Sequence, residues 1–432
     1  MRQLLLRGSL VSFVLQAVGA LLIFASEVLL ARVLGAAHYG VFATVMAWLQ
    51  LLTIVGLLGS NYLLLRFVPV YVEEQAWGLL RGILRLGWMT GLALAVMVYV
   101  LVPALLKLLA PEQSSLQFWA FVVGLGALPF YVLSAQRQAI LRGLHRIFSA
   151  LAPEYVVRPL VLIGLLLAFY FGSQHEVEAP QALGMNLVAA LLAFALGWLW
   201  QRRAMPKPVS AATPDYQAPE WLRIAVPLGL IALLQLLIVR LDIIMLSSLA
   251  GEEQAGVYAA ASRFADLLIF ALMAMNAIVA PVISRLHARG ENDKLQQLLL
   301  MMARAMLLFV VPMLLFIGLF GDRVLALFGE DYLPAFYPLL ILSAGQAVNA
   351  LSGPVGFLLS MTGHQRQMLQ VLMLAAGINL VLNLLLIPEY GITGAAISTA
   401  VTAVLWNLLL RWVVRRRLGV EPSVLALVGV RP

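Results

Sequence analysis

The stretch LVSFVLQAVGALLIFASEVLLARVL, residues 10–34, contains only two charged side chains, Glu27 and Arg32. A helix of about 20 mostly apolar residues is long enough to cross the hydrocarbon core of a bilayer. Residues 10–34 therefore predict a membrane-spanning helix. The whole chain shares this character, because 63% of its 432 residues are hydrophobic and 11% are charged, whereas soluble domains have about 25% charged residues.

Eleven further stretches of the same kind follow along the chain. They are too long and too continuous for the alternating segments of about 10 residues that are typical of transmembrane β-barrels. The sequence therefore predicts an all-α polytopic membrane protein with about 12 transmembrane helices. The expected spans are approximately 10–34, 40–68, 83–109, 116–138, 147–171, 181–200, 222–249, 256–283, 299–320, 333–361, 367–387 and 391–412.

The positive charges indicate how these spans are oriented. Lys and Arg are concentrated in the loops on the cytoplasmic side of a membrane. When the N-terminus and every second loop are placed in the cytoplasm, the opposite loops contain only three of the 28 Lys and Arg residues, Arg32, Lys107 and Arg323. We therefore expect a multi-pass protein of a bacterial inner membrane with both termini in the cytoplasm.

A proline-rich segment divides the chain near its middle. QRRAMPKPVSAATPDYQAPEW, residues 201–221, contains four prolines and no apolar periodicity, which is typical of a linker. The predicted organisation is an N-terminal six-helix bundle, a cytoplasmic linker, a C-terminal six-helix bundle and a cytoplasmic basic tail, at residues 1–200, 201–221, 222–412 and 413–432.

The two halves resemble each other. LGAAHYGVFA at 34–43 aligns with AGEEQAGVYA at 250–259, and RGLHR at 142–146 matches TGHQR at 362–366 in the same topological position. These matches favour a duplicated unit of six spans. An even number of spans per repeat makes the two units parallel, related by an axis along the membrane normal, and many transporters with repeated halves alternate access at the site between them.

Several kinds of chemistry have no support in the sequence. The chain has no Cys, which excludes disulfides, thiolate metal sites and cysteine nucleophiles. It also has no phosphate-binding loop of the G-x-x-x-x-G-K-[ST] type, and its five His are dispersed, so we expect no cofactor and no metal. The net charge of +8 is spread between apolar stretches, which fits membrane topology and predicts no nucleic-acid partner.

Seven charged side chains lie more than five residues from either end of the predicted spans, where charges are costly and are functional candidates. They are Glu27, Glu154, Arg158, Arg240, Asp242, Arg263 and Asp266. The spacing of Glu154–Arg158 and of Arg263–Asp266 allows ion pairs along one helix. Arg240 and Asp242 are two residues apart and face different sides of a helix, so each needs a partner elsewhere.

Uncharged polar residues accompany these charges. Gln346, Asn349, Asn379 and Asn383 lie near the middle of the predicted spans. Amides inside a membrane form hydrogen bonds between helices, and together with the charged groups they suggest a partly hydrated path at the interface of the halves.

Long stretches of the sequence resemble the polysaccharide-transporter family, the Wzx-type oligosaccharide flippases of the MOP (multidrug/oligosaccharidyl-lipid/polysaccharide) exporter superfamily. These stretches cover nearly the whole chain. They are LARVLGAAHYGVFA at 30–43, LRGLHR at 141–146, DIIMLSSLAGEEQAGVYAAASRFADLL at 242–268, APVISRLHARG at 280–290, LFGEDYLPAF at 327–336 and INLVLNLLLIPEYGITGAAISTA at 378–400.

The resemblance implies two six-helix bundles around a V-shaped cavity, as in MATE-like transporters. It also implies a flippase that moves an undecaprenyl-pyrophosphate-linked oligosaccharide, such as an O-antigen or exopolysaccharide unit, to the outer leaflet. The expected partners are this lipid-linked oligosaccharide, membrane lipids, H⁺ or Na⁺, and a glycan polymerase or glycosyltransferases. Two alternatives stay open: a multidrug/cation antiporter of the same superfamily, and a membrane enzyme of glycan assembly.

The site residues are assigned from the charges, because the family supplies no catalytic motif. We expect no catalytic residue. Arg240, Arg263 and Arg158 are the candidates for contact with the diphosphate, since the planar guanidinium binds phosphate oxygens in pairs and stays charged at depth. The candidates for ion coupling are the carboxylates of Glu27, Asp242, Asp266 and Glu154.

Overall fold

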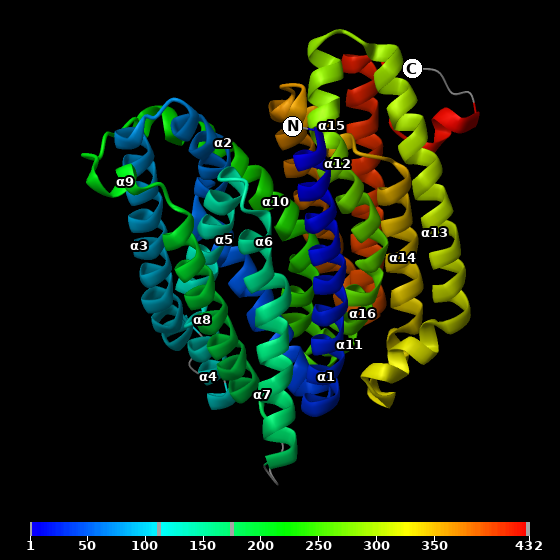
Figure 1. Cartoon of the computed structure of the whole chain (residues 1–432). Helices are drawn as coiled ribbons and strands as arrows, with labels where there is room; N and C mark the ends of the chain where they lie inside the picture. The colour runs from blue at the N-terminus through cyan, green and yellow to red at the C-terminus, as the bar shows by residue number, and fades with distance from the viewer. Residues whose placement is uncertain (1, 110–113, 173–176, 429–432) are drawn as a thin grey trace. The chain divides into compact units, whose positions relative to one another are not determined.

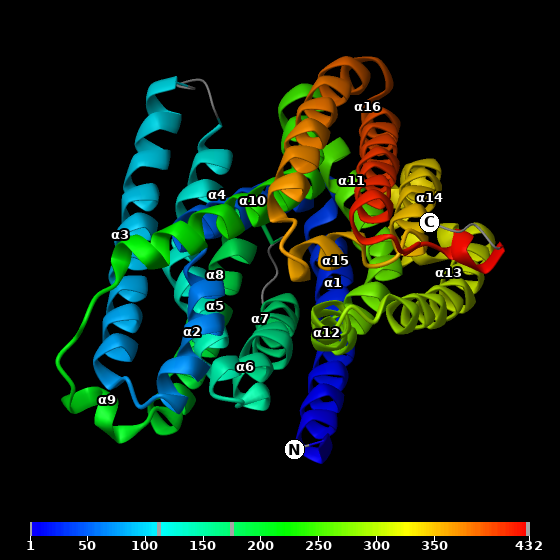
Figure 2. The same cartoon turned by 90° about the horizontal axis from the view of Figure 1, so that it is seen from above.

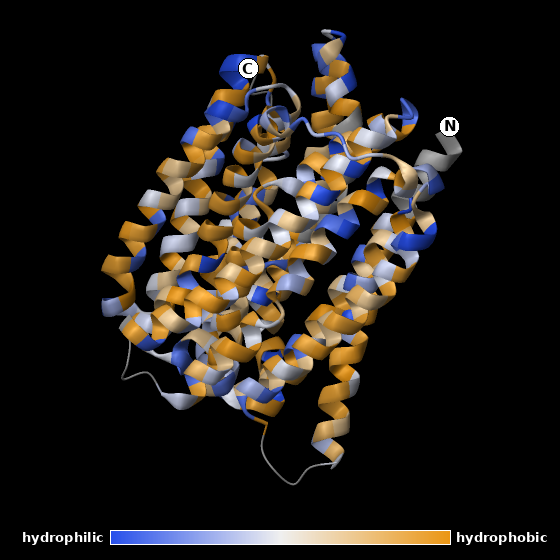
Figure 3. Ribbon diagram, turned by 90° about the vertical axis from the view of Figure 1, so that its left-hand side faces the viewer, coloured by the Kyte–Doolittle hydropathy of each residue, from blue (hydrophilic) through white to orange (hydrophobic). Residues whose placement is uncertain are grey.

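The computed structural model describes residues 2–109, 114–172 and 177–428, and every regular element in them is helical. Within these described residues, eight helices are long and apolar enough to cross a membrane, or nine if the bent pair Glu330–Leu351 and Val355–Met361 counts as one span. Figure 3 shows these helices apolar along most of their length. The predicted all-α membrane fold is confirmed.

The count of eight and the predicted count of about 12 differ because several predicted spans are joined or split. Helix α1 (Arg2–Leu57) is divided at Gly35, which has φ 70° and ψ 170°. Helix α16 (Gln365–Leu418) is divided in the same way at Gly391, with φ 54° and ψ −129°. Helix α16 therefore contains two expected spans, and α1 contains one and the first part of a second, 40–68, which continues in the next helix, Ser60–Glu73. The expected span 256–283 is instead split at Asp266.

Contacts divide the chain into two compact units. The first consists of residues 1–34 and 41–236, and the second of residues 35–40 and 237–432. The boundary at Leu236 lies inside helix α10 (Ala218–Ala250), downstream of the predicted linker.

The first unit contains the helices from α1 to the first part of α10 (Figures 1 and 2). In chain order these are α1 outside residues 35–40, α2 (Ser60–Glu73), α3 (Trp77–Leu109), α4 (Ser115–Leu125), α5 (Leu128–Gly143), α6 (Ile147–Ala152), the π-helix η1 (Pro153–Val157), α7 (Arg158–Gly172), α8 (Ala179–Ala204), α9 (Lys207–Ala211) and α10 to Leu236.

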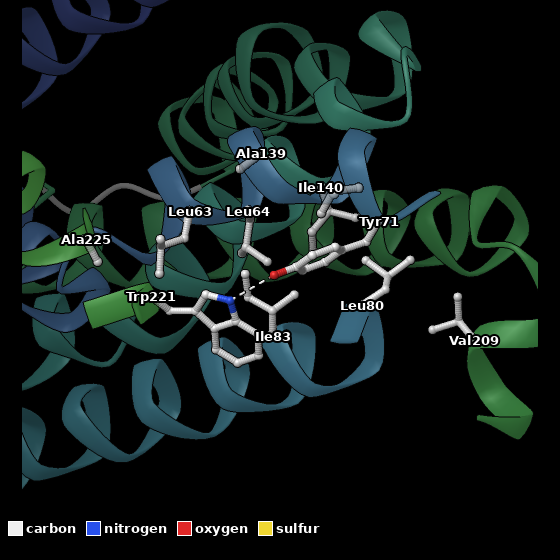
Figure 4. Packing of buried hydrophobic residues seen from close by; sticks show 11 residues of the cluster. Leu63, Leu64, Tyr71, Leu80, Ile83, Ala139, Ile140, Val209, Trp221 and Ala225 are labelled. Atoms are coloured by element: carbon white, nitrogen blue, oxygen red, sulfur yellow. Dashed lines mark hydrogen bonds between the residues drawn. The ribbon is translucent and has the colours of Figure 1, made fainter. Parts of the chain in front are cut away.

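A buried cluster joins the start of α10 to α2, α3 and α5 in this unit. Trp221 is fully buried, and its indole N–H donates a hydrogen bond of 3.0 Å to the Tyr71 hydroxyl (Figure 4). Leu64, Leu80 and Ile140 are also fully buried in the cluster. Burial of an aromatic pair with its polar atoms satisfied stabilises a contact strongly, so α10 begins as part of the first unit.

The predicted linker is more ordered than its prolines suggest. Val209, on the short helix α9, is buried in the same cluster. The backbone N–H of Asp215 donates to the carbonyl of Gly78 at 2.9 Å, and Arg81 donates to the carbonyl of Ala212. These bonds tie the segment to α3, so its proline content does not leave it unstructured.

The second unit follows from α10 to the C-terminal region (Figures 1 and 2). Its elements are the rest of α10, α11 (Glu252–Ala265), α12 (Leu267–Ala288), α13 (Asn292–Phe328), the 3-10 helix η2 (Glu330–Ala335), α14 (Phe336–Leu351), α15 (Val355–Met361), α16 and the 3-10 helix η3 (Val424–Val428).

The predicted basic tail, residues 413–432, is largely folded onto this unit as far as residue 428. Its first residues complete α16, which ends at Leu418. Beyond it, the Glu421 side chain is only 1% exposed and pairs with Arg411 at 2.7 Å and Arg415 at 3.4 Å. The Gln296 amide bonds the backbone N–H and carbonyl of Glu421. The buried carboxylate of Glu421 therefore anchors this part of the predicted tail to α13 and α16.

Candidate functional site

Asp242 is at the centre of a buried hydrogen-bond cluster in the second unit. The residue is 2% exposed, and its carboxylate accepts hydrogen bonds from the Tyr258 hydroxyl and, at 3.0 Å, from the Thr399 hydroxyl. The Ile243 backbone N–H donates to the same carboxylate at 2.8 Å. The cluster therefore joins α10, α11 and the second half of α16 around one acidic group.

Arg240 lies two residues earlier on α10 and has a different partner. Its Nη1 is 3.7 Å from Oδ2 of Asp266, the residue between α11 and α12. The sequence spacing predicts this divergence, because residues two apart do not share a helix face. The sequence spacing predicts that Asp266 pairs with Arg263 on its own helix. In the structure, Asp266 forms an ion pair with Arg240 of α10.

A chain of amides continues from Asp266 to the second half of α16. Gln346 donates to Asp266 at 3.5 Å, Asn349 donates to Gln346 at 3.3 Å, and Asn407 donates to Asn349 at 3.1 Å. Gln346 and Asn407 are buried. These side chains connect the ion pair of Arg240 and Asp266 to α14 and α16.

The two predicted asparagines of the first half of α16 have a structural role. Asn383 donates to Asn379 at 3.1 Å, and Asn379 donates to Thr402 at 3.4 Å. Both asparagines are fully buried. They hold the two halves of α16 together across Gly391, as interhelical amides do.

A second charged cluster lies in the first unit, around Glu154. Its carboxylate is 3.8 Å from Arg158, the predicted pair along one helix, and 3.3 Å from Arg137 of α5. The Arg158 guanidinium also lies over the ring of Tyr131, 4.9 Å from its centroid, and the Tyr131 hydroxyl is 3.3 Å from Asn186. Glu154 and Arg158 are therefore parts of a packed network.

Arg137 belongs to this charged network, although the sequence does not make it a candidate site residue. The positive-inside pattern places it with the cytoplasmic loops, but its side chain is 1% exposed. The guanidinium packs against Gly197 of α8, where a Cβ would be 2.3 Å away. The sequence offers one sign of this burial, because Arg137 lies inside the predicted span 116–138.

Glu27 and Arg263 are half-buried on α1 and α11. The candidates thus separate into two groups. Arg240, Asp242 and Asp266 are in the second unit with Arg263, and Glu27, Glu154 and Arg158 are in the first.

The sequence missed Tyr258 and Thr399, the two hydroxyl donors to Asp242. Tyr258 is part of the repeated motif AGEEQAGVYA, whose sequence indicates duplication and family resemblance but no partner for Asp242. Within residues 2–109, 114–172 and 177–428, no three His, Asp or Glu side chains are grouped as a metal site requires.

Comparisons with known proteins agree on the class of fold. Residues 5–287 match the family model described as polysaccharide biosynthesis protein, and residues 227–385 match the MatE model. The chain is 24% identical over 381 residues to an uncharacterized membrane protein, MJ1068, of Methanocaldococcus jannaschii, which covers 83% of this chain and 74% of that protein. It is 23% identical over 163 residues to the probable low-salt glycan biosynthesis flippase Agl15 of Haloferax volcanii, covering 38% of this chain and 34% of that protein.

Two solved structures share the fold over nearly the whole chain. The lipid II flippase MurJ in an inward closed conformation has a TM-score of 0.73 at 17% identity, with 95% of this chain and 87% of that chain covered. A multidrug resistance MATE family transporter of the MOP superfamily, in an inward-facing conformation, has a TM-score of 0.72 at 16% identity, with 98% and 99% covered.

Proposed function

Because the chain belongs to the polysaccharide biosynthesis protein family of the MOP superfamily, we propose that it is a flippase for a lipid-linked oligosaccharide. The proposed substrate is an undecaprenyl-pyrophosphate-linked oligosaccharide, moved by alternating access from the cytoplasmic to the outer leaflet of a bacterial inner membrane. Both termini are proposed to be cytoplasmic. A glycan polymerase or glycosyltransferases are the proposed partners that supply the substrate or consume the product.

The observation that carries this proposal is the Arg240–Asp266 pair, because Arg240 lies on α10, a helix long and apolar enough to cross a membrane. The polar head group of such a substrate cannot cross a hydrocarbon layer of about 30 Å unaided. A buried arginine offers a planar, permanently charged donor for a diphosphate. At 3.7 Å, the contact with Asp266 is longer than a charge-assisted hydrogen bond. We propose that the diphosphate replaces Asp266 as the partner of Arg240, with Arg263 as a second contact.

Arg158 is a weaker candidate for substrate contact than its charge suggests. Its guanidinium is stacked on Tyr131 and paired with Glu154, so binding a phosphate there would cost two existing interactions. We propose a positioning role for Arg158 and Glu154 in the first unit.

The second proposal concerns the driving force. Asp242 is buried with hydroxyl partners, and a carboxylate held by neutral donors can exchange a proton or Na⁺ without breaking an ion pair. We propose that Asp242 is the ion-coupling group. Asp266 and Glu154 already face arginines, and Glu27 is retained as the alternative.

A cation antiporter is the second candidate function. It is favoured by the match of residues 227–385 to the MatE model and by the acidic group at Asp242. An antiporter would bind a soluble cationic compound at this carboxylate. In that case Arg240 would bind no anionic substrate.

A null mutant tests the proposed function directly. We expect loss of a surface polysaccharide and accumulation of its lipid-linked precursor on the cytoplasmic side, restored by the wild-type gene but not by Arg240→Ala. Arg323→Ala is the matched control, because Arg323 is exposed at the end of α13. Normal surface glycan together with raised sensitivity to cationic drugs would establish the antiporter instead.

A further inference from the structure

Five residues near the end of α16 line a pocket of about 420 Å³: Leu408, Arg411, Trp412, Arg415 and Arg416. Their spacing places them on one face of the helix. The pocket is therefore a continuous groove along roughly two turns of helix.

The order of side chains along this groove follows the polarity of a membrane surface. Leu408 is 50% exposed and Trp412 is 58% exposed. Arg411 directly precedes Trp412, and Arg415 and Arg416 follow it toward the helix end. Apolar chains suit the hydrocarbon, Trp suits the interfacial level, and Arg side chains reach the head groups. The Arg416 guanidinium lies 5.3 Å from the centroid of the Trp412 ring, which joins the interfacial and charged parts.

The buried carboxylate of Glu421 holds two of the lining arginines in position. Arg411 forms two hydrogen bonds with Glu421, at 2.8 and 2.7 Å, and Arg415 is 3.4 Å from the same carboxylate. Ser423 also donates its hydroxyl to Glu421 at 2.6 Å. The pocket is lined by three arginines, and Glu421 balances the charge of only one of them, so the groove keeps a net positive charge. Arg411 and Arg415 are held in position by this carboxylate.

We propose that this groove binds the phosphate head group of an anionic phospholipid. The arginines would contact the phosphate, and Trp412 and Leu408 would contact the glycerol region and the start of an acyl chain. The exposed apolar residues favour a phospholipid over a free phosphate, because a phosphate ion has no apolar part to contact them. The site is separate from the Arg240 and Asp242 clusters and does not depend on the proposed transport function.

Helix α8 provides a natural control. Arg202 lies 4.6 Å from the Trp198 ring centroid, the same pair at the same spacing as Trp412 and Arg416. The positions that correspond to Arg411 and Arg415 are Gly197 and Gln201. The end of α8 thus has the aromatic–cation pair without the two arginines that Glu421 holds.

The experiment measures lipid binding to the delipidated full-length protein by native mass spectrometry. The probes are dioleoylphosphatidylglycerol and dioleoylphosphatidylcholine in equal amounts, which differ in head-group charge. We expect a preference for phosphatidylglycerol that falls about fivefold for each arginine removed, in Arg416→Gln and in Arg415→Gln/Arg416→Gln. Arg416→Gln leaves both ion pairs of Glu421 in place, so this variant keeps the test valid if the double variant misfolds.

Arg202→Gln/Arg203→Gln removes the same charge from the end of α8 and should leave the preference unchanged. An equal loss in both double variants would overturn the proposal, because it would show a general effect of net charge. Excess inorganic phosphate should not displace the lipid, and displacement would show a site for a free anion instead. Trp412→Ala should weaken binding of both lipids, and unchanged binding would overturn the role given to the apolar end.

Discussion

Gly40 and Gly256 pack against each other in the second unit, and their contact is reciprocal. A Cβ on Gly40 would lie 1.7 Å from the Glu252 carbonyl oxygen, and a Cβ on Gly256 would lie 2.1 Å from the Ala36 carbonyl oxygen. The two glycines occupy the same position in the aligned motifs LGAAHYGVFA and AGEEQAGVYA. Such reciprocity arises when two copies of one motif cross about a two-fold axis, as expected for parallel repeats.

Gly40→Ala and Gly256→Ala should each separate these two segments. Because the obstructing atoms are backbone, neither side can yield by changing a rotamer, and overpacking of this kind costs about 1–3 kcal/mol. We expect a lower melting temperature of the purified protein and reduced transport. Gly318→Ala on α13 is the control, since nothing lies within 4 Å of that position, and it should be neutral or stabilising. Equal effects at all three positions would contradict the contact.

Arg240→Lys should separate substrate binding from folding. Lysine keeps a positive charge beside Asp266, so we expect normal protein abundance, but it lacks the planar fork that binds a phosphate in two places. Transport of the lipid-linked glycan should therefore fall nearly as far as in Arg240→Ala. Arg240→Ala should also lower abundance, because it leaves the Asp266 charge unpaired. Normal transport by Arg240→Lys would contradict the proposed contact between Arg240 and the diphosphate of the substrate.

Asp242→Asn should uncouple transport from the ion gradient. Asparagine keeps an oxygen that can accept from Tyr258 and Thr399, so we expect a folded protein. Its transport, measured in vesicles before and after collapse of the H⁺ and Na⁺ gradients, should be weak and insensitive to the collapse. Glu27→Gln is the parallel variant. If both variants transport at the wild-type rate and both respond to the collapse as the wild type does, neither residue couples transport.

Glu421→Gln should release the end of α16. Burial raises the pKa of Glu421, but hydrogen bonds from Arg411 and Ser423 outweigh burial and hold that pKa below its usual value of 4.5. Its stabilising effect is therefore complete above about pH 4.5 and is lost as the pH falls through the lower folded value. Glu421→Gln should cost about 1–3 kcal/mol at neutral pH. Loosening of the end of α16 should also speed tryptic cleavage of the backbone after Arg415, Arg416 and Arg417. Glu330→Gln, at an exposed position, should do neither.

Cysteine labelling tests the proposed orientation, and the chain has no native Cys to remove. Glu253 of α11 and Pro208 of α9 are both exposed. In whole cells, Glu253→Cys should react with an impermeant thiol reagent, and Pro208→Cys should react only after the membrane is permeabilised. The opposite pattern would reverse the orientation.

The fold class could be predicted because the length of each uninterrupted apolar stretch can be read directly from the sequence. The helix breaks at Gly35 and Gly391 could not, since a glycine in a long apolar run is also tolerated inside a helix. The separate partners of Arg240 and Asp242 followed from their spacing. Tyr258 and Thr399 could not be assigned to Asp242 from the sequence, because Thr399 lies 157 residues away from it and only the packing of α16 brings them together.

Residues 35–40 belong to the second unit although the ribosome makes them before nearly all of the first. At about 5–20 residues per second, α11 follows them after roughly 10–40 s. During that interval the Gly40 surface has no partner, and the first unit can complete its own core. The Gly40–Gly256 contact therefore closes late in synthesis. A chain that stops before α11 would expose this small-residue surface in the membrane, where quality-control proteases could recognise it.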